Sequence, residues 1–334
     1  MDIVILLVGL LAAVYGAGLL VDGGSAIAKR YDIPTVVIGS TIVAFGTSMP
    51  ELAVNISSAL DGNTDLALGN VLGSNLFNIC AIVGIACLLA PMTISGECAS
   101  HDLPMCLIAA IVVGVCGNQI YLDKINYHEL FLSDGLVFLC FLILFMRYVY
   151  GEAGSSTADH SVALESGLSG GSGGADSGDS EPVPHAMGKA IAFVILGLVG
   201  LVLGGEFIVD GASGIAHSMG LSDRVIGLLI VGPGTSFPEL MASVAAARRN
   251  DVGMVMGNVL GSNILNIFFT LGITALILPI PLDLALNSVV LINIAVTALL
   301  LVYLIFRKDM TLGRGMGALL VLIYGCYIAY SLLQ

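Results

Sequence analysis

Long apolar stretches recur along most of the chain, and short polar segments separate them. Several stretches reach roughly 18 residues or more, about the length that an α-helix needs to cross a bilayer. The short alternating segments that are typical of a membrane β-barrel do not occur. The pattern therefore predicts an all-α polytopic membrane protein with ten transmembrane helices. These are expected near residues 3 to 28, 36 to 60, 66 to 90, 103 to 121, 130 to 149, 188 to 210, 224 to 247, 253 to 278, 285 to 306 and 315 to 333.

One polar segment is much longer than the others and separates the fifth predicted helix from the sixth. It reads "GEAGSSTADHSVALESGLSGGSGGADSGDSEPVPHAM" and carries six acids but no Lys or Arg. Such a segment cannot bury enough apolar surface to fold alone. A calcium-sensing role is the weaker alternative, because the ligand spacing of an EF-hand is missing. We expect a five-helix repeat at 1–149, a flexible acidic linker at 150–187 and a second five-helix repeat at 188–334.

Composition and charge support a membrane protein and indicate its orientation. Of the 334 residues, 57% are hydrophobic and 10% are charged, against about 25% charged in a soluble domain. The net charge of −13 argues against a nucleic-acid partner. With the N-terminus outside, nine of the eleven Lys and Arg residues lie on the cytoplasmic side. We therefore expect an inner-membrane protein with both termini outside and the linker in the cytoplasm. Its predicted partners are the lipid bilayer and the substrate ions Ca²⁺ and Na⁺, and no protein partner is predicted.

The two halves of the chain match each other without a gap at an offset of 188 residues. "VIGSTIVAFGTSMPEL" pairs with "VIGLLIVGPGTSFPEL", and "GNVLGSNLFNI" pairs with "GNVLGSNILNI". From Gly46 to Ile79, 16 of 34 positions are identical to their counterparts. Because each half has five helices, equivalent helices must cross in opposite directions. The sequence therefore predicts an inverted-topology repeat whose copies, near 39–79 and 227–267, meet at the bilayer midplane.

Each copy places a proline and a glutamate within an apolar helix. Pro50 and Pro238 donate no backbone hydrogen bond, so the carbonyls of Gly46 and Gly234 lack their helical partners. Hydroxyl, amide and carboxylate groups gather at helical spacing around these breaks. The candidate side-chain ligands are Thr47, Ser48, Glu51, Ser74 and Asn78 in the first copy and Thr235, Ser236, Glu239, Ser262 and Asn266 in the second. Because every donor atom is oxygen, the set suits Ca²⁺ or Na⁺ rather than a soft transition metal.

Charge indicates what such a site would do. Two unpaired carboxylates at the midplane would cost several kcal/mol, and these helix segments contain no Lys or Arg. One Ca²⁺, two or more Na⁺ or two protons would neutralise them. A site that mutually exclusive ions neutralise is the basis of an antiporter.

Some of these residues also have a purely structural interpretation. "GNVLG" is a G-x-x-x-G pattern that packs helices closely without any ion, although packing alone does not require a glutamate in each copy. For Asp22 and Asp210, which lie near helix ends, a capping or interfacial role is favoured over ion binding. Glu206 has Gly18 as its counterpart and is an accessory candidate only.

The motifs "GTSMPEL…GNVLGSNLFNI" and "GTSFPEL…GNVLGSNILNI" resemble the α-repeats of the calcium/cation antiporter superfamily, in its bacterial and archaeal sodium/calcium exchanger branch. The resemblance implies a secondary antiporter that exports Ca²⁺ against Na⁺ entry at the ten side chains given above. It also implies that the first and sixth helices slide across the rest. Asn266 stands where some relatives have Asp, so potassium co-transport is not favoured. Pro233 departs from the usual "A-x-G-T-S" of the family, so the two half-sites are expected to differ.

Two other functions stay open at this point. An H⁺/Ca²⁺ antiporter of the same fold would use protons in place of Na⁺ at Glu51 and Glu239. A cation channel or a non-transporting calcium-binding membrane protein is less favoured, because an inverted repeat suits alternating access. No covalent chemistry is implied, so neither an enzyme nor a cofactor is expected, and Ca²⁺ and Na⁺ are the expected substrates.

Overall fold

The computed structural model describes residues 1–60, 62, 65–118, 129–165, 187–220, 232–282 and 284–333, and most of them are helical. Within these ranges, eight helices are long and apolar enough to cross a membrane: Asp2–Tyr31, Ala67–Leu89, Cys98–Gly117, Leu132–Gly151, Met187–Ser218, Val252–Ile277, Leu286–Phe306 and Arg314–Leu332. The pair Thr35–Thr47 and Met49–Leu60, bent by 43°, makes a ninth span. The predicted span at 224–247 begins outside the described residues, so the count of ten stays a prediction.

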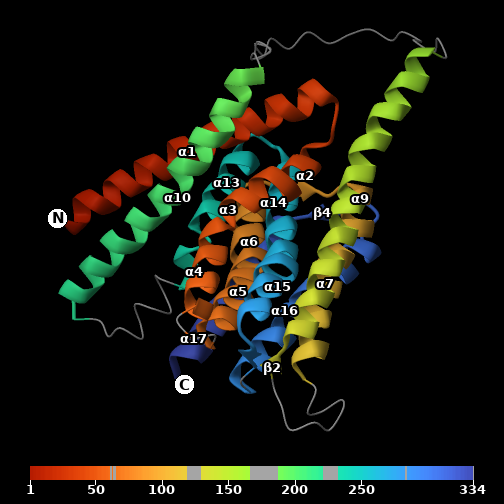
Figure 1. Cartoon of the computed structure of the whole chain (residues 1–334). Helices are drawn as coiled ribbons and strands as arrows, with labels where there is room; N and C mark the ends of the chain where they lie inside the picture. Colours follow the sequence, from red (N-terminus) through yellow and green to blue (C-terminus); the bar gives the residue numbers. More distant parts are fainter. Residues whose placement is uncertain are drawn as a thin grey trace.

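Figure 1 labels most of the elements. The helices are α1 (Asp2–Tyr31), α2 (Thr35–Ile38), α3 (Ala44–Thr47), α4 (Met49–Leu60), α5 (Asp65–Phe77), α6 (Val83–Leu89), α7 (Leu103–Gly117), α9 (Leu132–Glu165), α10 (Met187–Ser218), α12 (Gly232–Gly234), α13 (Phe237–Arg248), α14 (Val252–Leu265), α15 (Gly272–Ile277), α16 (Leu284–Phe306) and α17 (Arg314–Leu333). The π-helical segments are η1 (Gly39–Val43), η2 (Asn78–Ile82), η3 (Cys98–Asp102) and η5 (Asn266–Leu271). The strands are β1 (Met92–Thr93), β2 (Glu129–Leu130), β3 (Ile280–Pro281) and β4 (Thr311–Leu312).

The fifth predicted helix is longer than its apolar stretch indicates. Helix α9 continues to Glu165, whereas the sequence predicts an end near residue 149. The first part of the expected flexible linker is therefore helical. The rest of the linker, residues 166–186, lies outside the described part of the chain.

Two spans form the centre of the bundle. In the span Ala67–Leu89 83% of the most apolar window is buried, and in Val252–Ile277 the share is 78%, while the other six long spans reach only 17% to 44%. Every residue of α14 from Met254 to Leu265 is buried. These central helices carry the "GNVLGSN" motifs, so the polar motif residues lie inside the protein and away from lipid.

Small residues allow α14 to lie against η1 with almost no space between the backbones. A Cβ atom added at Gly261 would lie 2.5 Å from Ser40 Cα and 2.8 Å from the Ser40 carbonyl oxygen. At Gly257 it would collide with the Val36 carbonyl oxygen. The predicted packing role of the glycines is thus confirmed for the second copy. In the first copy the counterparts are Gly69 and Gly73. The segment equivalent to η1, residues 227–231, lies outside the described residues, so the packing role of these two glycines stays a prediction.

Helices α1 and α10 lie side by side and cross the remaining helices obliquely (Figure 1). Glycines spaced seven residues apart line both contact faces. On α1 they are Gly9, Gly16 and Gly23, and on α10 they are Gly197, Gly204 and Gly211. A Cβ at Gly204 would lie 2.7 Å from the backbone nitrogen of Ala13. The pair is held by direct backbone contact, as in small-residue packing of membrane helices.

Two very short antiparallel strand pairs, which the helical pattern does not predict, join the two halves. Met92 pairs with Leu312, and Glu129 pairs with Pro281. Each pair ties a loop of the first half to a loop of the second half. The fold is otherwise the all-α architecture that the sequence predicts.

Replacing Gly261 with Ala tests the close contact between α14 and η1. Because the Ser40 backbone occupies the space, we expect a loss of about 1–3 kcal/mol of stability, measured as a lower melting temperature in detergent. Gly315→Ala is the matched control, since a Cβ there meets no heavy atom within 4 Å. The control should melt at or slightly above the wild-type temperature. Equal melting of G261A and wild type would contradict this packing.

Candidate functional site

The polar centre of the protein is built on two helix breaks. Ser48 interrupts the helix between α3 and α4 with φ −85° and ψ 7°. Ser236, its counterpart, precedes α13 with nearly the same angles, φ −91° and ψ 7°. Pro50 and Pro238 lie in the first turn after each break, where a missing N–H costs little. Each break therefore turns a serine hydroxyl inward and begins a new helix that carries the glutamate.

The two glutamates are held by serines from opposite halves of the chain. Ser236 donates a hydrogen bond to Glu51 Oε1 at 3.0 Å, and Ser48 donates one to Glu239 Oε1, also at 3.0 Å. Both glutamates are fully buried. The carboxylates and the serines thus form a reciprocal arrangement across the centre of the protein.

Serines of the two central helices contact the same carboxylate oxygens. Ser74 donates to Glu51 Oε1 at 3.2 Å, and Ser262 donates to Glu239 Oε1 at 3.5 Å. All four of these serine bonds therefore reach Oε1. The second oxygen of each carboxylate, Oε2, receives none of these bonds.

Four asparagines form a buried layer beside the glutamates. Asn75 and Asn263, which are 188 residues apart, exchange side-chain-to-backbone hydrogen bonds of 3.1 Å. Asn78 donates to Asn263 Oδ1 at 3.0 Å, and Asn266 donates to Asn75 Oδ1 at 3.1 Å. Asn266 also donates to the Ser74 hydroxyl at 3.1 Å. These bonds use the NH₂ groups of Asn78 and Asn266. The Oδ1 atoms of the same two side chains take no part in them.

The π-helical segments begin at the same asparagines. Segment η2 starts at Asn78 and η5 starts at Asn266. A π-turn widens the helix by one residue and is frequent at functional sites. The parallel positions indicate that both copies shape the backbone in the same way around this layer.

Four buried oxygen atoms of the centre have no hydrogen-bond partner among the described residues: Glu51 Oε2, Glu239 Oε2, Asn78 Oδ1 and Asn266 Oδ1. Each is an acceptor, and a buried acceptor without a partner costs about 1–3 kcal/mol, more when it is charged. Two carboxylate and two amide oxygens match the ligand preference of Ca²⁺ and Na⁺. In the described part of the chain, no group of three or more His, Cys, Asp or Glu side chains gathers as a metal cluster. The chemistry of these four oxygens therefore suits a hard cation better than a soft one.

The two threonines of the motifs lie at the edge of this cluster. Thr47 donates to Asn258 Oδ1 at 3.2 Å and to the Val43 carbonyl at 3.0 Å. Thr235 donates to Asn70 Oδ1 at 3.4 Å. Their hydroxyl oxygens can still accept a cation, while the hydrogen bonds join each break to the central helix of the other half.

Sequence reasoning placed all ten candidate side chains in one region, and the hydrogen bonds given above connect them across the two halves. No described contact places the carbonyls of Gly46 and Gly234 in the cluster, so their role as ligands stays a prediction. The sequence reasoning did not single out four further residues, although all of them stand in the repeated "GNVLGSN" segments: Asn70, Asn75, Asn258 and Asn263. Their identity in both copies is the signal that could have found them.

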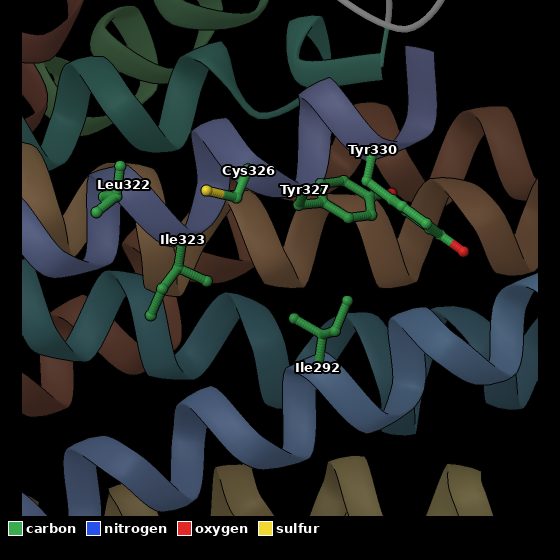
Figure 2. A pocket seen from close by; sticks show the side chains of 6 residues that line it. All are labelled: Ile292, Leu322, Ile323, Cys326, Tyr327 and Tyr330. Atoms are coloured by element: carbon green, nitrogen blue, oxygen red, sulfur yellow. The ribbon is translucent and has the colours of Figure 1, made fainter. Parts of the chain in front are cut away.

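A separate cavity of about 360 Å³ lies between α16 and α17 and differs in character from the polar centre. Figure 2 shows its lining: Ile292, Leu322, Ile323, Cys326, Tyr327 and Tyr330. It contains no carboxylate or amide side chain. This cavity is therefore not a candidate for a cation site.

Comparison with known proteins agrees with this geometry. The family model described as sodium/calcium exchanger protein matches residues 1–151 and 189–333. Inner membrane protein YrbG of Escherichia coli (strain K12) is 32% identical over 321 residues, covering 95% of this chain and 92% of that protein. Sodium/calcium exchanger MaX1 of Methanosarcina acetivorans is 30% identical over 344 residues, with 98% and 97% covered. A structure of the sodium-calcium exchanger NCX_Mj, soaked with zero Na⁺ and Ca²⁺, is 29% identical, has a TM-score of 0.78 and is matched over 98% of both chains.

The fold and these matches define the class as a multi-pass membrane ion transporter and not an enzyme. Within that class, the chain belongs to the sodium/calcium exchanger family. The resemblance carried by the two repeated motifs is thereby confirmed.

Calcium binding at the four unpartnered oxygens should stabilise the protein. Saturation at about 100 times the dissociation constant gives about 2.7 kcal/mol, so Ca²⁺ should raise the melting temperature in detergent. The double variant Glu51→Gln/Glu239→Gln should lose this increase. Without Ca²⁺, it should melt at or above wild type, because two buried charges are removed. Asp309→Asn, which removes an exposed partner of Arg307, should keep the full increase. A calcium-dependent shift of equal size in the double variant would exclude the glutamates as ligands.

Proposed function

We propose that this protein is a secondary antiporter that exchanges Na⁺ for Ca²⁺ at one central site. The observation that carries this proposal is the group of four buried, unpartnered oxygens. Two of them belong to carboxylates, and no ion pair joins either carboxylate to a described Lys or Arg. The ligands are Thr47, Ser48, Glu51, Ser74 and Asn78 with their counterparts Thr235, Ser236, Glu239, Ser262 and Asn266, together with the carbonyls of Gly46 and Gly234.

Charge neutrality makes occupation by the two ions mutually exclusive. One Ca²⁺ offsets the two charges of Glu51 and Glu239, and so do two Na⁺ ions. An empty site would leave both charges uncompensated in the membrane, which costs several kcal/mol. The loaded protein, with either ion, therefore changes conformation more readily than the empty one. This coupling is what converts entry of Na⁺ into export of Ca²⁺.

Alternating access follows from an inverted relation between the halves. The reciprocal Ser236–Glu51 and Ser48–Glu239 bonds support such a relation, because each bond is the counterpart of the other at the offset of 188. The same holds for the bonds between Asn75 and Asn263. Two halves of opposite orientation can exchange conformations, which would expose one site alternately to the two sides.

The described contacts favour a conformation that is closed on the side of Arg249. Arg249 forms an ion pair of 3.0 Å with Asp22 on α1. Asp251 accepts hydrogen bonds from Ser25 at 3.3 Å and from Thr35 at 2.7 Å. By the positive-inside rule this is the cytoplasmic side, with both termini outside. We interpret the conformation as facing outward, and Asp22 takes the interfacial role expected for it.

Sodium is favoured over protons as the coupling ion because the site has more oxygen ligands than the binding of two protons would require. Neutral oxygens of Ser74, Asn78, Ser262 and Asn266 surround the carboxylates, and they would coordinate Na⁺. Proton coupling at Glu51 and Glu239 remains the second candidate. The amide at Asn266, in place of an acid, disfavours a role for K⁺.

Uptake of ⁴⁵Ca²⁺ into proteoliposomes distinguishes the coupling ions. Vesicles loaded with Na⁺ and diluted into Na⁺-free buffer should accumulate ⁴⁵Ca²⁺, and an imposed pH gradient of equal size without Na⁺ should not drive uptake. Uptake that follows the pH gradient and ignores Na⁺ would overturn the proposal in favour of an H⁺/Ca²⁺ antiporter.

The same assay tests the two glutamates. Removing one carboxylate ligand should cost about 3 kcal/mol, which reduces exchange about 100-fold in Glu51→Ala and in Glu239→Ala. Glu97→Gln, which removes an exposed carboxylate outside the site, is the matched control and should exchange like wild type. If either alanine variant, checked for folding by gel filtration, exchanges at the wild-type rate, the assignment of the site is wrong.

A further inference from the structure

Two asparagines of the buried layer, Asn75 on α5 and Asn263 on α14, are not among the candidate ligands. They are counterparts at the offset of 188, and both side chains are buried. Each uses both of its side-chain polar atoms in hydrogen bonds to the other half of the chain. Neither contributes to the buried oxygens that lack a partner in the described part of the chain, so their role differs from that of Asn78 and Asn266.

A backbone carbonyl fixes the orientation of each of these two amides. Asn263 Nδ2 donates to the Asn75 carbonyl at 3.1 Å, and Asn75 Nδ2 donates to the Asn263 carbonyl, also at 3.1 Å. Because a carbonyl can only accept, an amide turned the other way would set oxygen against oxygen. The NH₂ group of each side chain therefore points toward the backbone of the other helix, and its Oδ1 lies on the opposite side of the amide.

The two Oδ1 atoms in turn orient the amides of two candidate ligands. Asn78 Nδ2 donates to Asn263 Oδ1 at 3.0 Å, and Asn266 Nδ2 donates to Asn75 Oδ1 at 3.1 Å. An amide oxygen cannot donate, so Asn78 and Asn266 must each present an NH₂ group to it. Their own oxygens are thereby left as unpartnered acceptors of the central site. The orientation of each ligand thus depends on a side chain from the other half.

We propose that Asn75 and Asn263 are positioning residues that set the preference of the central site for Ca²⁺ over Na⁺. The proposal rests on the exchange site proposed above. By holding the NH₂ groups of Asn266 and Asn78, the two residues keep both amide oxygens available to the cation. An amide that is free to turn would present its NH₂ group, which repels a cation, for part of the time.

The charge of the ion converts this orientation into selectivity. The interaction energy of an ion with an amide dipole is proportional to the charge of the ion. When an amide loses its orientation, Ca²⁺ therefore loses about twice the binding free energy that one Na⁺ loses. The Kd for Ca²⁺ should then rise by about the square of the factor by which the Kd for Na⁺ rises.

The two ligand amides are not held equally. Asn266 Nδ2 also donates to the Ser74 hydroxyl at 3.1 Å, so both of its N–H groups are used. Among the described contacts, Asn78 donates only to Asn263. Loss of the Asn263 side chain should therefore release Asn78. Loss of the Asn75 side chain leaves Asn266 bound to Ser74, so its effect should be smaller.

Calcium binding to the full-length protein in detergent, measured by isothermal titration calorimetry with Na⁺ as the competitor, tests this proposal. Asn263→Leu keeps the branched shape of the side chain and removes its hydrogen-bonding atoms. It should raise the Kd for Ca²⁺ about 10- to 100-fold and the Kd for Na⁺ only about threefold to tenfold. Asn75→Leu should shift both values in the same direction by smaller factors.

Asn293→Leu is the matched control. Asn293 is also a buried asparagine, and it donates to the carbonyls of Leu72 and Val289 and not to the asparagine layer. This variant loses the same chemical group from the membrane interior, so it should bind both ions as wild type does.

A change of ligand separates positioning from a purely structural role. An aspartate presents an oxygen whichever way it turns, so it does not need Asn263 to orient it. In the Asn78→Asp background, Asn263→Leu should therefore no longer raise the Kd for Ca²⁺. Asn75 bonds to Asn266 and not to Asn78, so the effect of Asn75→Leu should be the same in this background as in wild type. The pair Asn75→Leu and Asn266→Asp repeats the test in the other half, and it decides the proposal if Asn263→Leu does not fold.

The outcomes distinguish this proposal from the exchange site itself. Wild-type protein that binds no Ca²⁺, or binds it without competition by Na⁺, would refute the exchange site and the positioning role with it. If wild type binds both ions and Asn263→Leu, folded by gel filtration, leaves the ratio of the two Kd values unchanged, only the positioning role is refuted. A rise in Kd that persists in the Asn78→Asp background would identify a structural role and would also refute the proposal.

Discussion

The reciprocal hydrogen bonds between Ser48 and Glu239 and between Ser236 and Glu51 are the interactions on which the rest of the structure depends. Each half of the chain supplies the carboxylate that the other half holds, so neither half-site is complete alone. The helix breaks lie at these two serines, three residues before the glutamate of the same half. This requirement also explains the glycine-lined contacts of α14, which allow the backbones to approach closely enough for side chains as short as serine to reach the opposite carboxylate.

Much of the site could be predicted because polar residues in a membrane helix are costly and therefore informative. Glu51 and Glu239 stand out in apolar stretches, and the repeat of 188 residues pairs them. The sequence could not indicate which oxygen of each group would stay free, because that depends on contacts between distant helices. Asn75 and Asn263 illustrate this: their bonds orient Asn78 and Asn266 across the two halves, and no local pattern reveals such a pairing. The helical extension of α9 to Glu165 and the short strand pairs were missed for a related reason, since their sequences have no apolar pattern that predicts them.

The two halves agree at the centre and differ at the periphery. The serine bonds to the two glutamates have counterparts in both halves, whereas the charged residues on α1 and α10 differ. At one end Arg249 neutralises Asp22, and at the other a cavity is lined by Glu206 and Asp210.

The central claim is that Glu51 Oε2, Glu239 Oε2, Asn78 Oδ1 and Asn266 Oδ1 share one bound cation. An anomalous difference map from crystals grown with Ca²⁺ or soaked with Sr²⁺ tests it most directly. For Ca²⁺, the account predicts one strong peak about 2.3–2.6 Å from oxygens of both glutamates, and its loss when Na⁺ is raised in excess. A peak that contacts neither carboxylate, or an empty centre at a saturating Ca²⁺ concentration, would contradict it.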